Sequence, residues 1–229
     1  MAYNISTMHI WRFFNGECEC PMCKLKLKTE CDIAESYLSE AVMEDAEREK
    51  VNKHGFCKEH YDLLYSGKNK CGLALQELTR LKRVDKLIKP VDVKSAVKSA
   101  KKLREELDDC IICRKLEFNM KRYFETVARL YGDDEKFRKQ FETVKGFCYP
   151  DYIRLVENAP KAGKYAKDFL KVLYEKQKES AKELYNNLET FTLAFDYRST
   201  SLPPKSAAQS LIQARIKFYG EKPTLPERR

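Results

Sequence analysis

The sequence lacks long apolar runs, a secretory signal and recognisable β-strands. No apolar stretch approaches the roughly 20 residues that a membrane-spanning helix needs. The start of the chain has no basic region followed by an apolar segment, so we expect no signal peptide. Nowhere does a stretch of alternating apolar and polar residues lie between turn residues. We therefore expect an all-α protein without a transmembrane segment, located in the cytoplasm.

The chain also lacks the short motifs that mark common enzyme classes. It contains neither a Gly-rich phosphate-binding loop nor a nucleophile elbow with an exposed serine. Hydrophobic residues make up 43% of the 229 positions, which is enough to build a core, so the chain is expected to fold. The missing catalytic motifs favour a binding or structural role over an enzyme.

Nine cysteines are present, and their arrangement indicates metal ligands instead of disulfides. Their number is odd, and several occur in pairs separated by two residues. Disulfide frameworks are typical of secreted proteins, whereas this chain has no expected signal for secretion. We therefore expect reduced thiols in an intracellular protein.

Two Cys-x-x-Cys turns are each followed by a Gly-Phe-Cys segment at a matched distance. In the first copy, Cys20 and Cys23 precede Cys57 and His60, and the gap from Cys23 to Cys57 is 34 positions. Zinc favours four tetrahedral ligands, which three thiolates and one imidazole supply. The sequence therefore predicts a first zinc site made of Cys20, Cys23, Cys57 and His60.

The second copy repeats this pattern with an aspartate in place of the histidine. Cys110 and Cys113 precede Cys148 after a gap of 35 positions, and Asp151 follows Cys148 by three residues. The sequence therefore predicts a second site of Cys110, Cys113, Cys148 and Asp151.

This second site leaves three alternatives open. A carboxylate is an ordinary zinc ligand, but it adds negative charge, which Lys145 or Arg154 could offset. Alternatively, the site has lost its metal or keeps an open position for water. For the first site, an iron–sulfur cluster and metal-free core cysteines left by a duplication are the remaining interpretations.

Three further cysteines, Cys18, Cys31 and Cys71, have no counterparts in the second copy. Cys18 could replace Cys20 as a ligand or act as a redox thiol near the first site. The alternative is that Cys18 is a spare, partly buried cysteine.

The expected organisation follows the duplication and the helical spacing of apolar residues. Residues 1–89 are expected to form an N-terminal zinc-type helical repeat, and residues 90–107 a basic helical connector. Residues 108–198 are expected to form a second repeat with the altered metal motif, ending in a long helix from about residue 163 to residue 195. Residues 199–229 are expected to form a loop and a C-terminal helix.

The formal charge of +9 is concentrated in one segment. From Arg80 to Arg104 there are ten Lys and Arg against two Asp, and there is no aromatic residue on which a base could stack. This segment is a candidate surface for contacting phosphates or a protein partner. A solvated helical connector is the alternative interpretation.

The paired motifs resemble those of a family of bacterial proteins classed as a domain of unknown function. The matching features are Cys-Pro-x-Cys near the N-terminus, Gly-Phe-Cys-x-x-His, a second Cys-x-x-Cys, and the signature Phe195-Asp196-Tyr197-Arg198. The similarity covers nearly the whole chain, and it departs at Asp151, where the family pattern has a histidine. The resemblance implies the repeat and the ligand assignment, and it implies no activity.

Three functions compete at this point. The first is a zinc-stabilised, non-enzymatic helical module that binds a protein or nucleic acid through its basic surface. The second is a thiol-based redox or metal sensor that releases zinc on oxidation. The third is an enzyme with a site between the two repeats, using Asp151, Tyr149 and Tyr152.

Overall fold

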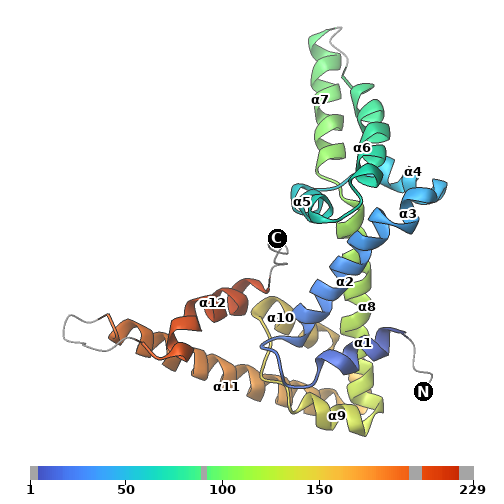
Figure 1. The fold of residues 1–229 in the computed structure, drawn as a ribbon. Helices are drawn as coiled ribbons and strands as arrows, with labels where there is room; N and C mark the ends of the chain where they lie inside the picture. Colours follow the sequence, from blue (N-terminus) through green and yellow to red (C-terminus); the bar gives the residue numbers. More distant parts are fainter. Residues whose placement is uncertain (1–4, 89–91, 196–202, 222–229) are drawn as a thin grey trace. The chain divides into compact units, whose positions relative to one another are not determined.

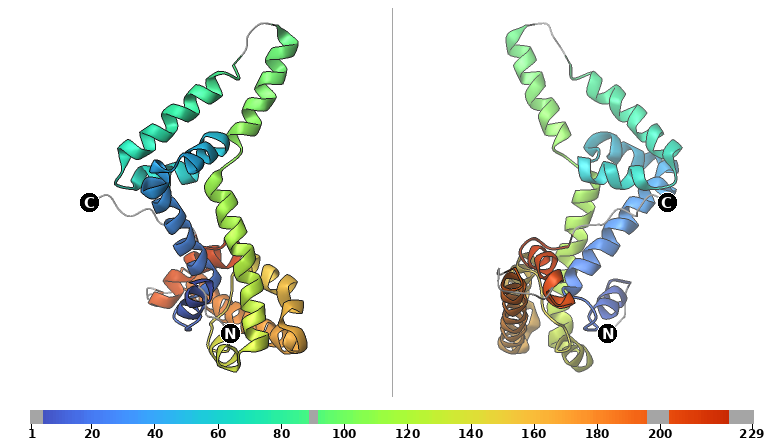
Figure 2. Two further views of the ribbon diagram at one scale, coloured as in Figure 1. Left: turned by 90° about the vertical axis from the view of Figure 1, so that its right-hand side faces the viewer. Right: turned by 60° about the vertical axis from the view of Figure 1, so that its left-hand side comes forward.

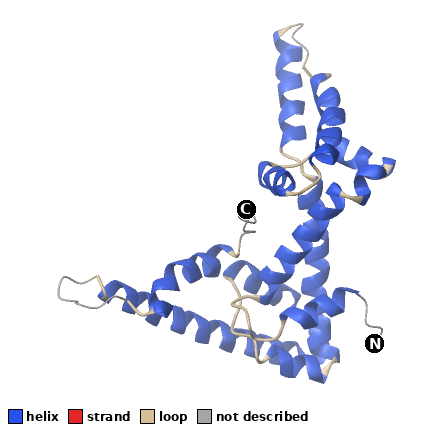
Figure 3. Ribbon diagram, in the orientation of Figure 1, coloured by secondary structure: helices blue, strands red, loops and turns tan. Residues whose placement is uncertain are grey.

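The computed structural model describes residues 5–88, 92–195 and 203–221, and these ranges contain helices and connecting loops without a β-strand (Figures 1 and 3). The all-α prediction is therefore confirmed. None of the described helices is both long and apolar enough to cross a membrane.

The contacts divide the chain into two compact units that do not follow the expected boundaries after residues 89 and 107. One unit contains residues 1–27 and 120–222, and the other contains residues 28–119. Helices α2 (Pro21–Leu38) and α8 (Ile111–Asp133) each begin in one unit and end in the other. The first Cys-x-x-Cys turn is therefore grouped with the second half of the chain.

The first unit holds the beginning of α2, the end of α8 and most of the C-terminal half. Its other helices are α1 (Ile5–Phe13), α9 (Glu135–Phe141), α10 (Tyr149–Asn158), the 3₁₀ segment η1 (Ala159–Tyr165), α11 (Ala166–Leu193) and α12 (Lys205–Tyr219). Helices α11 and α12 lie side by side (Figures 1 and 2). The long helix begins three residues after Gly163, whose positive φ of 59° interrupts the helical backbone.

Aromatic side chains form the core of the first unit. Phe141 is fully buried, and its ring centroid lies 5.3 to 5.7 Å from those of Phe14, Tyr131, Phe147 and Phe169. Such rings bury large apolar areas and attract one another in tilted and offset arrangements. This cluster fixes the segment that carries Phe147 and Cys148 against α1, α8 and α11.

The second unit holds the end of α2, the beginning of α8 and five helices between them. These are α3 (Glu40–Met43), α4 (Asp45–His54), α5 (Lys58–Ser66), α6 (Lys70–Asp85) and α7 (Val93–Leu107). Helices α6 and α7 extend away from α3, α4 and α5 (Figure 2). The basic connector expected at residues 90–107 is helical over the part that α7 covers, and residues 89–91 lie outside the described residues.

Two residues of the expected basic surface have structural contacts. Arg80 is buried, and its guanidinium donates hydrogen bonds to the backbone oxygens of Asn52 and Glu106. Arg83 forms an ion pair with the Glu106 carboxylate at 2.8 Å. These contacts fasten α6 to α4 and α7, so the candidate contact surface is smaller than the segment from Arg80 to Arg104.

Candidate metal centres

The structure brings the eight expected ligand residues into two groups, but it pairs the segments differently from the sequence-based prediction. One group, the His60 cluster, contains Cys57, His60, Cys110 and Cys113. The other, the Asp151 cluster, contains Cys20, Cys23, Cys148 and Asp151. Within each group the ligand atoms all lie within 4.8 Å of one another. Each Cys-x-x-Cys turn therefore meets the Gly-Phe-Cys segment of the other copy, and the predicted grouping within each copy is wrong.

All four ligand segments lie at the start of a helix. Cys20 and Cys110 immediately precede α2 and α8, and Cys57 and Cys148 are the N-cap residues of α5 and α10. The free N–H groups and the dipole at a helix N-terminus stabilise negative charge, which favours thiolates at these positions. The spacing could not reveal the pairing, because a duplicated motif presents the same ligands at the same intervals in both copies.

The His60 cluster is arranged around one imidazole nitrogen. His60 Nδ1 lies 3.1, 3.4 and 3.3 Å from the sulfurs of Cys57, Cys110 and Cys113, and the sulfurs of Cys57 and Cys113 are 3.8 Å apart. Zn–S bonds of about 2.3 Å place two sulfurs of a tetrahedron about 3.8 Å apart. The donor set and its dimensions therefore fit a zinc ion.

Glu30 of α2 orients this imidazole, and our sequence analysis did not identify it. Its carboxylate lies 2.9 Å from His60 Nε2, and both side chains are buried. A carboxylate on the second ring nitrogen leaves the first nitrogen free for a metal and raises its basicity. Glu30 lies three residues after Leu27 and four before Ala34, on the apolar face of its helix, and a carboxylate on that face was the available signal.

In the His60 cluster, a proton shared between the imidazole and a thiol occupies the place that a metal ion would take. Burial disfavours the charged imidazole, but hydrogen bonds with Cys110 and Glu30 outweigh it and raise the pKa of His60 to about 10. Burial likewise opposes ionisation of Cys110, yet its hydrogen bond with His60 lowers the pKa of that thiol to about 6. A cation at the centre takes over the role of this proton, because it attracts the same thiolates.

The Asp151 cluster is more deeply buried than the His60 cluster. The sulfur of Cys148 lies 3.9 and 3.6 Å from those of Cys20 and Cys23, and Asp151 Oδ2 is 3.1 to 3.3 Å from all three. All four residues are buried, whereas Cys113 in the His60 cluster is exposed. Three sulfurs and one oxygen at these distances also fit a zinc ion.

Hydrogen bonds and charges within the Asp151 cluster favour a cation at its centre. The hydrogen bond between Cys23 and Cys148 lowers the pKa of Cys23 to about 3, and burial together with the negative Cys23 raises the pKa of Asp151 to about 6. The group thus concentrates negative charge in a buried place, where it is costly without a positive partner.

The end of α12 and the residues just after it place two groups near the Asp151 cluster. The backbone N–H of Glu221 donates to Cys23 Sγ at 3.3 Å, immediately after Gly220, whose φ is 79°. Lys217 is buried, and its ammonium donates to Ser180 Oγ at 2.6 Å. Burial lowers the pKa of Lys217, while the negative charge of Cys20 and Cys148 opposes that effect.

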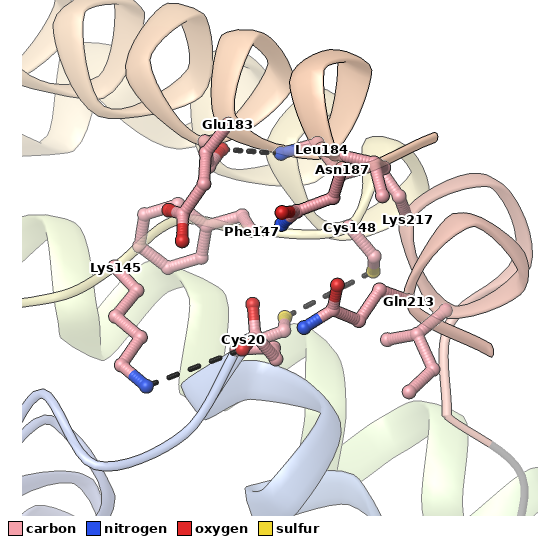
Figure 4. A pocket seen from close by; sticks show the side chains of 12 residues that line it. Cys20, Lys145, Phe147, Cys148, Glu183, Leu184, Asn187, Gln213 and Lys217 are labelled. Carbon is pink, nitrogen blue, oxygen red and sulfur yellow. Dashed lines mark hydrogen bonds and ion pairs between the residues drawn. The ribbon is translucent and has the colours of Figure 1, made fainter. Parts of the chain in front are cut away.

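The two cations expected to offset this charge are placed differently. Lys145 and Lys217 both line a small pocket beside Cys20 and Cys148 (Figure 4). The Arg154 guanidinium lies over the Phe124 ring at 4.3 Å. Lys217 is the buried cation of this pocket. The sequence did not indicate it, because it follows both motifs by more than sixty positions.

The three unmatched cysteines lie outside both clusters. Cys20 is itself in the Asp151 cluster, and the half-buried Cys18 thiol lies 3.7 Å from the backbone oxygen of Phe13. Cys31 and Cys71 are exposed. Burial raises the pKa of both Cys18 and Cys31, which keeps these thiols protonated and poorly nucleophilic at neutral pH.

No curated protein and no solved structure matches the chain. A family model does match it, over residues 1–224, and that family is described as one of unknown function, DUF6062. The match spans both metal clusters and agrees with the resemblance drawn from the paired motifs. The chain therefore belongs to the DUF6062 family.

Proposed function

We propose that this chain is a zinc-stabilised, non-enzymatic helical module that binds a macromolecular partner. The observation that carries the proposal is the joining of distant segments by each four-donor group. Cys23 and Cys148 are 125 positions apart, and Cys113 and His60 are 53 positions apart. An ion bound by such a group ties the ends of separate helices together.

Zinc suits these groups because it accepts sulfur, nitrogen and oxygen ligands in a tetrahedron. Structural zinc in small domains binds with about 10–16 kcal/mol, which is comparable to the whole folding free energy of about 5–15 kcal/mol of a typical domain. The metal is thus proposed to decide whether each unit is folded. Four protein ligands per site leave no position for a substrate, which supports a structural role over catalysis.

The pairing of ligands gives a direct test by native mass spectrometry and metal analysis. We expect two zinc ions in the intact chain and one in either Cys57→Ser or Cys23→Ser. The double variant Cys57→Ser/Cys113→Ser should keep one ion, because both residues belong to the His60 cluster. The double variant Cys57→Ser/Cys23→Ser should keep none.

A matched control and the opposing outcome are available in the same chain. Cys71→Ser changes an exposed cysteine outside both clusters and should retain two ions. A chain without bound metal would contradict the proposal. The opposite result would support pairing within each copy. In that case Cys57→Ser/Cys23→Ser would keep one ion, and Cys57→Ser/Cys113→Ser would keep none.

The partner surface is proposed to lie on α6 and α7, with nucleic acid as one partner. Seven cations there are exposed and form no ion pair with any described residue. They are Lys82, Lys86, Lys94, Lys98, Lys101, Lys102 and Arg104. Binding to phosphates weakens steeply as salt increases. Titration of labelled DNA and RNA at two salt concentrations tests this, and absence of salt-dependent binding would leave a protein partner.

A second candidate function, a thiol-based redox or metal sensor, is favoured by the exposure of one cluster. Cys113 is exposed and Cys57 half-buried, so an oxidant can reach the His60 cluster more easily than the buried Asp151 cluster. Dilute peroxide should then release one zinc ion before the other, which a chromogenic chelator would report. Simultaneous release, or none, would leave both ions purely structural.

A further inference from the structure

Helices α6 and α7 each carry an apolar stripe that no described residue covers. Leu78 and Leu81 on α6 are 52% and 68% exposed, and Val93 and Val97 on α7 are 83% and 65% exposed. Apolar side chains that continue along one helix face are typical of a surface that binds another helix. These stripes therefore need an explanation beyond the fold of the second unit.

Both stripes have the spacing of a coiled-coil seam. On α6 and just after it, exposed residues recur at alternating intervals of four and three, and the same intervals occur on α7. The α6 seam is Ala74, Leu78, Leu81, Asp85 and Ile88, and the α7 seam is Val93, Val97, Ala100, Arg104 and Leu107. This alternation keeps one face directed at a partner helix.

The charged members of the two seams complement each other. Each seam contains one charged residue at its fourth position, an aspartate on α6 and an arginine on α7. When the two seams are aligned in parallel from their first residues, Asp85 meets Arg104. The flanking Glu77 then lies opposite Lys101, because flanking positions of parallel coiled coils pair five residues further along. Two pairs of opposite charges, Asp85 with Arg104 and Glu77 with Lys101, therefore meet in the register that also pairs the apolar residues.

Three residues of the α6 seam, Ala74, Leu78 and Leu81, lie in one wall of a groove. Tyr61 and Tyr65 of α5 form the opposite wall, and Leu73, Ala74, Leu78 and Leu81 line the α6 side. Glu77 also lines this groove, half buried, and it forms no hydrogen bond or ion pair with any described residue. Lys70 also lines this groove, and a cation that arrives with the partner would further stabilise the half-buried carboxylate.

Pairing of identical seams is disfavoured. Two α7 seams aligned in the same way would place Arg104 against Arg104, with Lys94 and Lys101 on their flanks. Two α6 seams would place Asp85 against Asp85. Like charges across a helix interface are destabilising, whereas the mixed pair has no such clash.

We propose that α7 of one copy of this chain docks in parallel on the α6 groove of a second copy, with Arg104 facing Asp85. Within one chain α6 and α7 are consecutive helices of a hairpin, so the parallel pair forms only between copies. The occupant of the groove is thus another molecule of the same protein. Docking needs no nucleic acid, but its seam includes Arg104 and the flanking Lys101, which also belong to the proposed phosphate-contacting surface.

Sedimentation velocity of the full, metal-loaded chain over a range of concentrations tests the proposal. We expect concentration-dependent self-association. Asp85→Arg alone and Arg104→Asp alone should each weaken association by about tenfold or more, because each places like charges in the seam. The double variant Asp85→Arg/Arg104→Asp should restore association, and so should an equal mixture of the two single variants.

Controls separate this pairing from general charge effects. Lys98→Glu reverses an exposed charge on α7 away from the seam and should associate as the unchanged chain does. Circular dichroism should show equal helicity in all variants, because every changed side chain is exposed. A chain that stays monomeric at all concentrations would overturn the proposal. Association that neither single reversal weakens, or that the double variant fails to restore, would overturn it too.

Discussion

Glu30 lies outside both four-residue clusters, yet it holds the imidazole of the His60 cluster in place. It accepts a hydrogen bond from His60 Nε2 within the buried interior of the second unit, so it fixes the tautomer that directs Nδ1 toward the three sulfurs. A metal bound at Nδ1 would leave the ring proton of His60 on Nε2, where the Glu30 carboxylate accepts it.

Replacement of this carboxylate should weaken only one site. We expect Glu30→Gln to lower zinc affinity of the His60 cluster by about 10–100-fold while preserving the Asp151 cluster. Competition with a chelator of known affinity, followed by native mass spectrometry, measures the two ions separately. Glu35→Gln on the same helix is the control, since Glu35 is exposed. Equal losses at both sites would show that the substitution acts through general destabilisation.

Position 55 requires glycine for two reasons, its backbone conformation and the lack of room for a side chain. Its φ is 62°, and a side chain there would overlap the guanidinium of the buried Arg80. The residue precedes Phe56 and Cys57, and its carbonyl accepts a hydrogen bond from Ile111 N–H at 3.0 Å. This bond links the Gly-Phe-Cys segment to the start of α8 in the second unit.

A matched pair of substitutions separates the two requirements. Gly55→Ala should destabilise the protein by more than Gly163→Ala, because Gly163 has a similar φ of 59° but open space around it. The strain of a positive φ costs about 1 kcal/mol in both variants, and the overlap with Arg80 adds about 1–3 kcal/mol at Gly55. Urea unfolding of both variants measures the difference. Equal destabilisation would mean that Arg80 moves aside without cost.

At the scale of elements, α12 acts as a cover for the Asp151 cluster. The helix was predicted from its apolar spacing, but its contact with the cluster was not, because nothing local in the sequence relates residue 217 to residue 20. A buried lysine beside Cys20 and Cys148 would be stabilised by their negative charge once a metal ionises these thiols, and in turn it would offset that charge. The carboxylate ligand makes this offset more important here than in the His60 cluster.

Removal of the charge of Lys217 should therefore change metal binding at one cluster. We expect Lys217→Met, which preserves most of the packed side-chain stem, to weaken zinc at the Asp151 cluster by about tenfold. Arg215→Met on the same helix is the control, because Arg215 is exposed. An unchanged affinity in Lys217→Met would show that the lysine stabilises the packing of α12 on α11 and not the metal.

At the scale of the whole molecule, the sequence predicted the composition of the sites better than their connectivity. The helices and all eight ligand residues follow from local patterns: apolar spacing, helix-starting turns and the paired motifs. The grouping of ligands depends on which distant segments pack together, and two similar copies offer two groupings with equal local chemistry. Contacts between distant segments favour one of the two groupings, namely the packing of aromatic rings around Phe141 and the hydrogen bonds of the buried Arg80. Such contacts leave no pattern in the local sequence.

Because each cluster lies within one compact unit, loss of each metal should have a local effect. We expect Cys113→Ser to accelerate amide hydrogen exchange in residues 28–119, and Cys148→Ser to accelerate it in residues 1–27 and 120–222. The reason is that a structural metal supplies folding free energy to the segments it joins, and units without it open more often. Exchange measured by mass spectrometry on peptides assigns protection to each range, with Cys71→Ser as the control. Acceleration of residues 108–198 as one block in Cys113→Ser would contradict the crossed grouping and favour a chain that folds copy by copy.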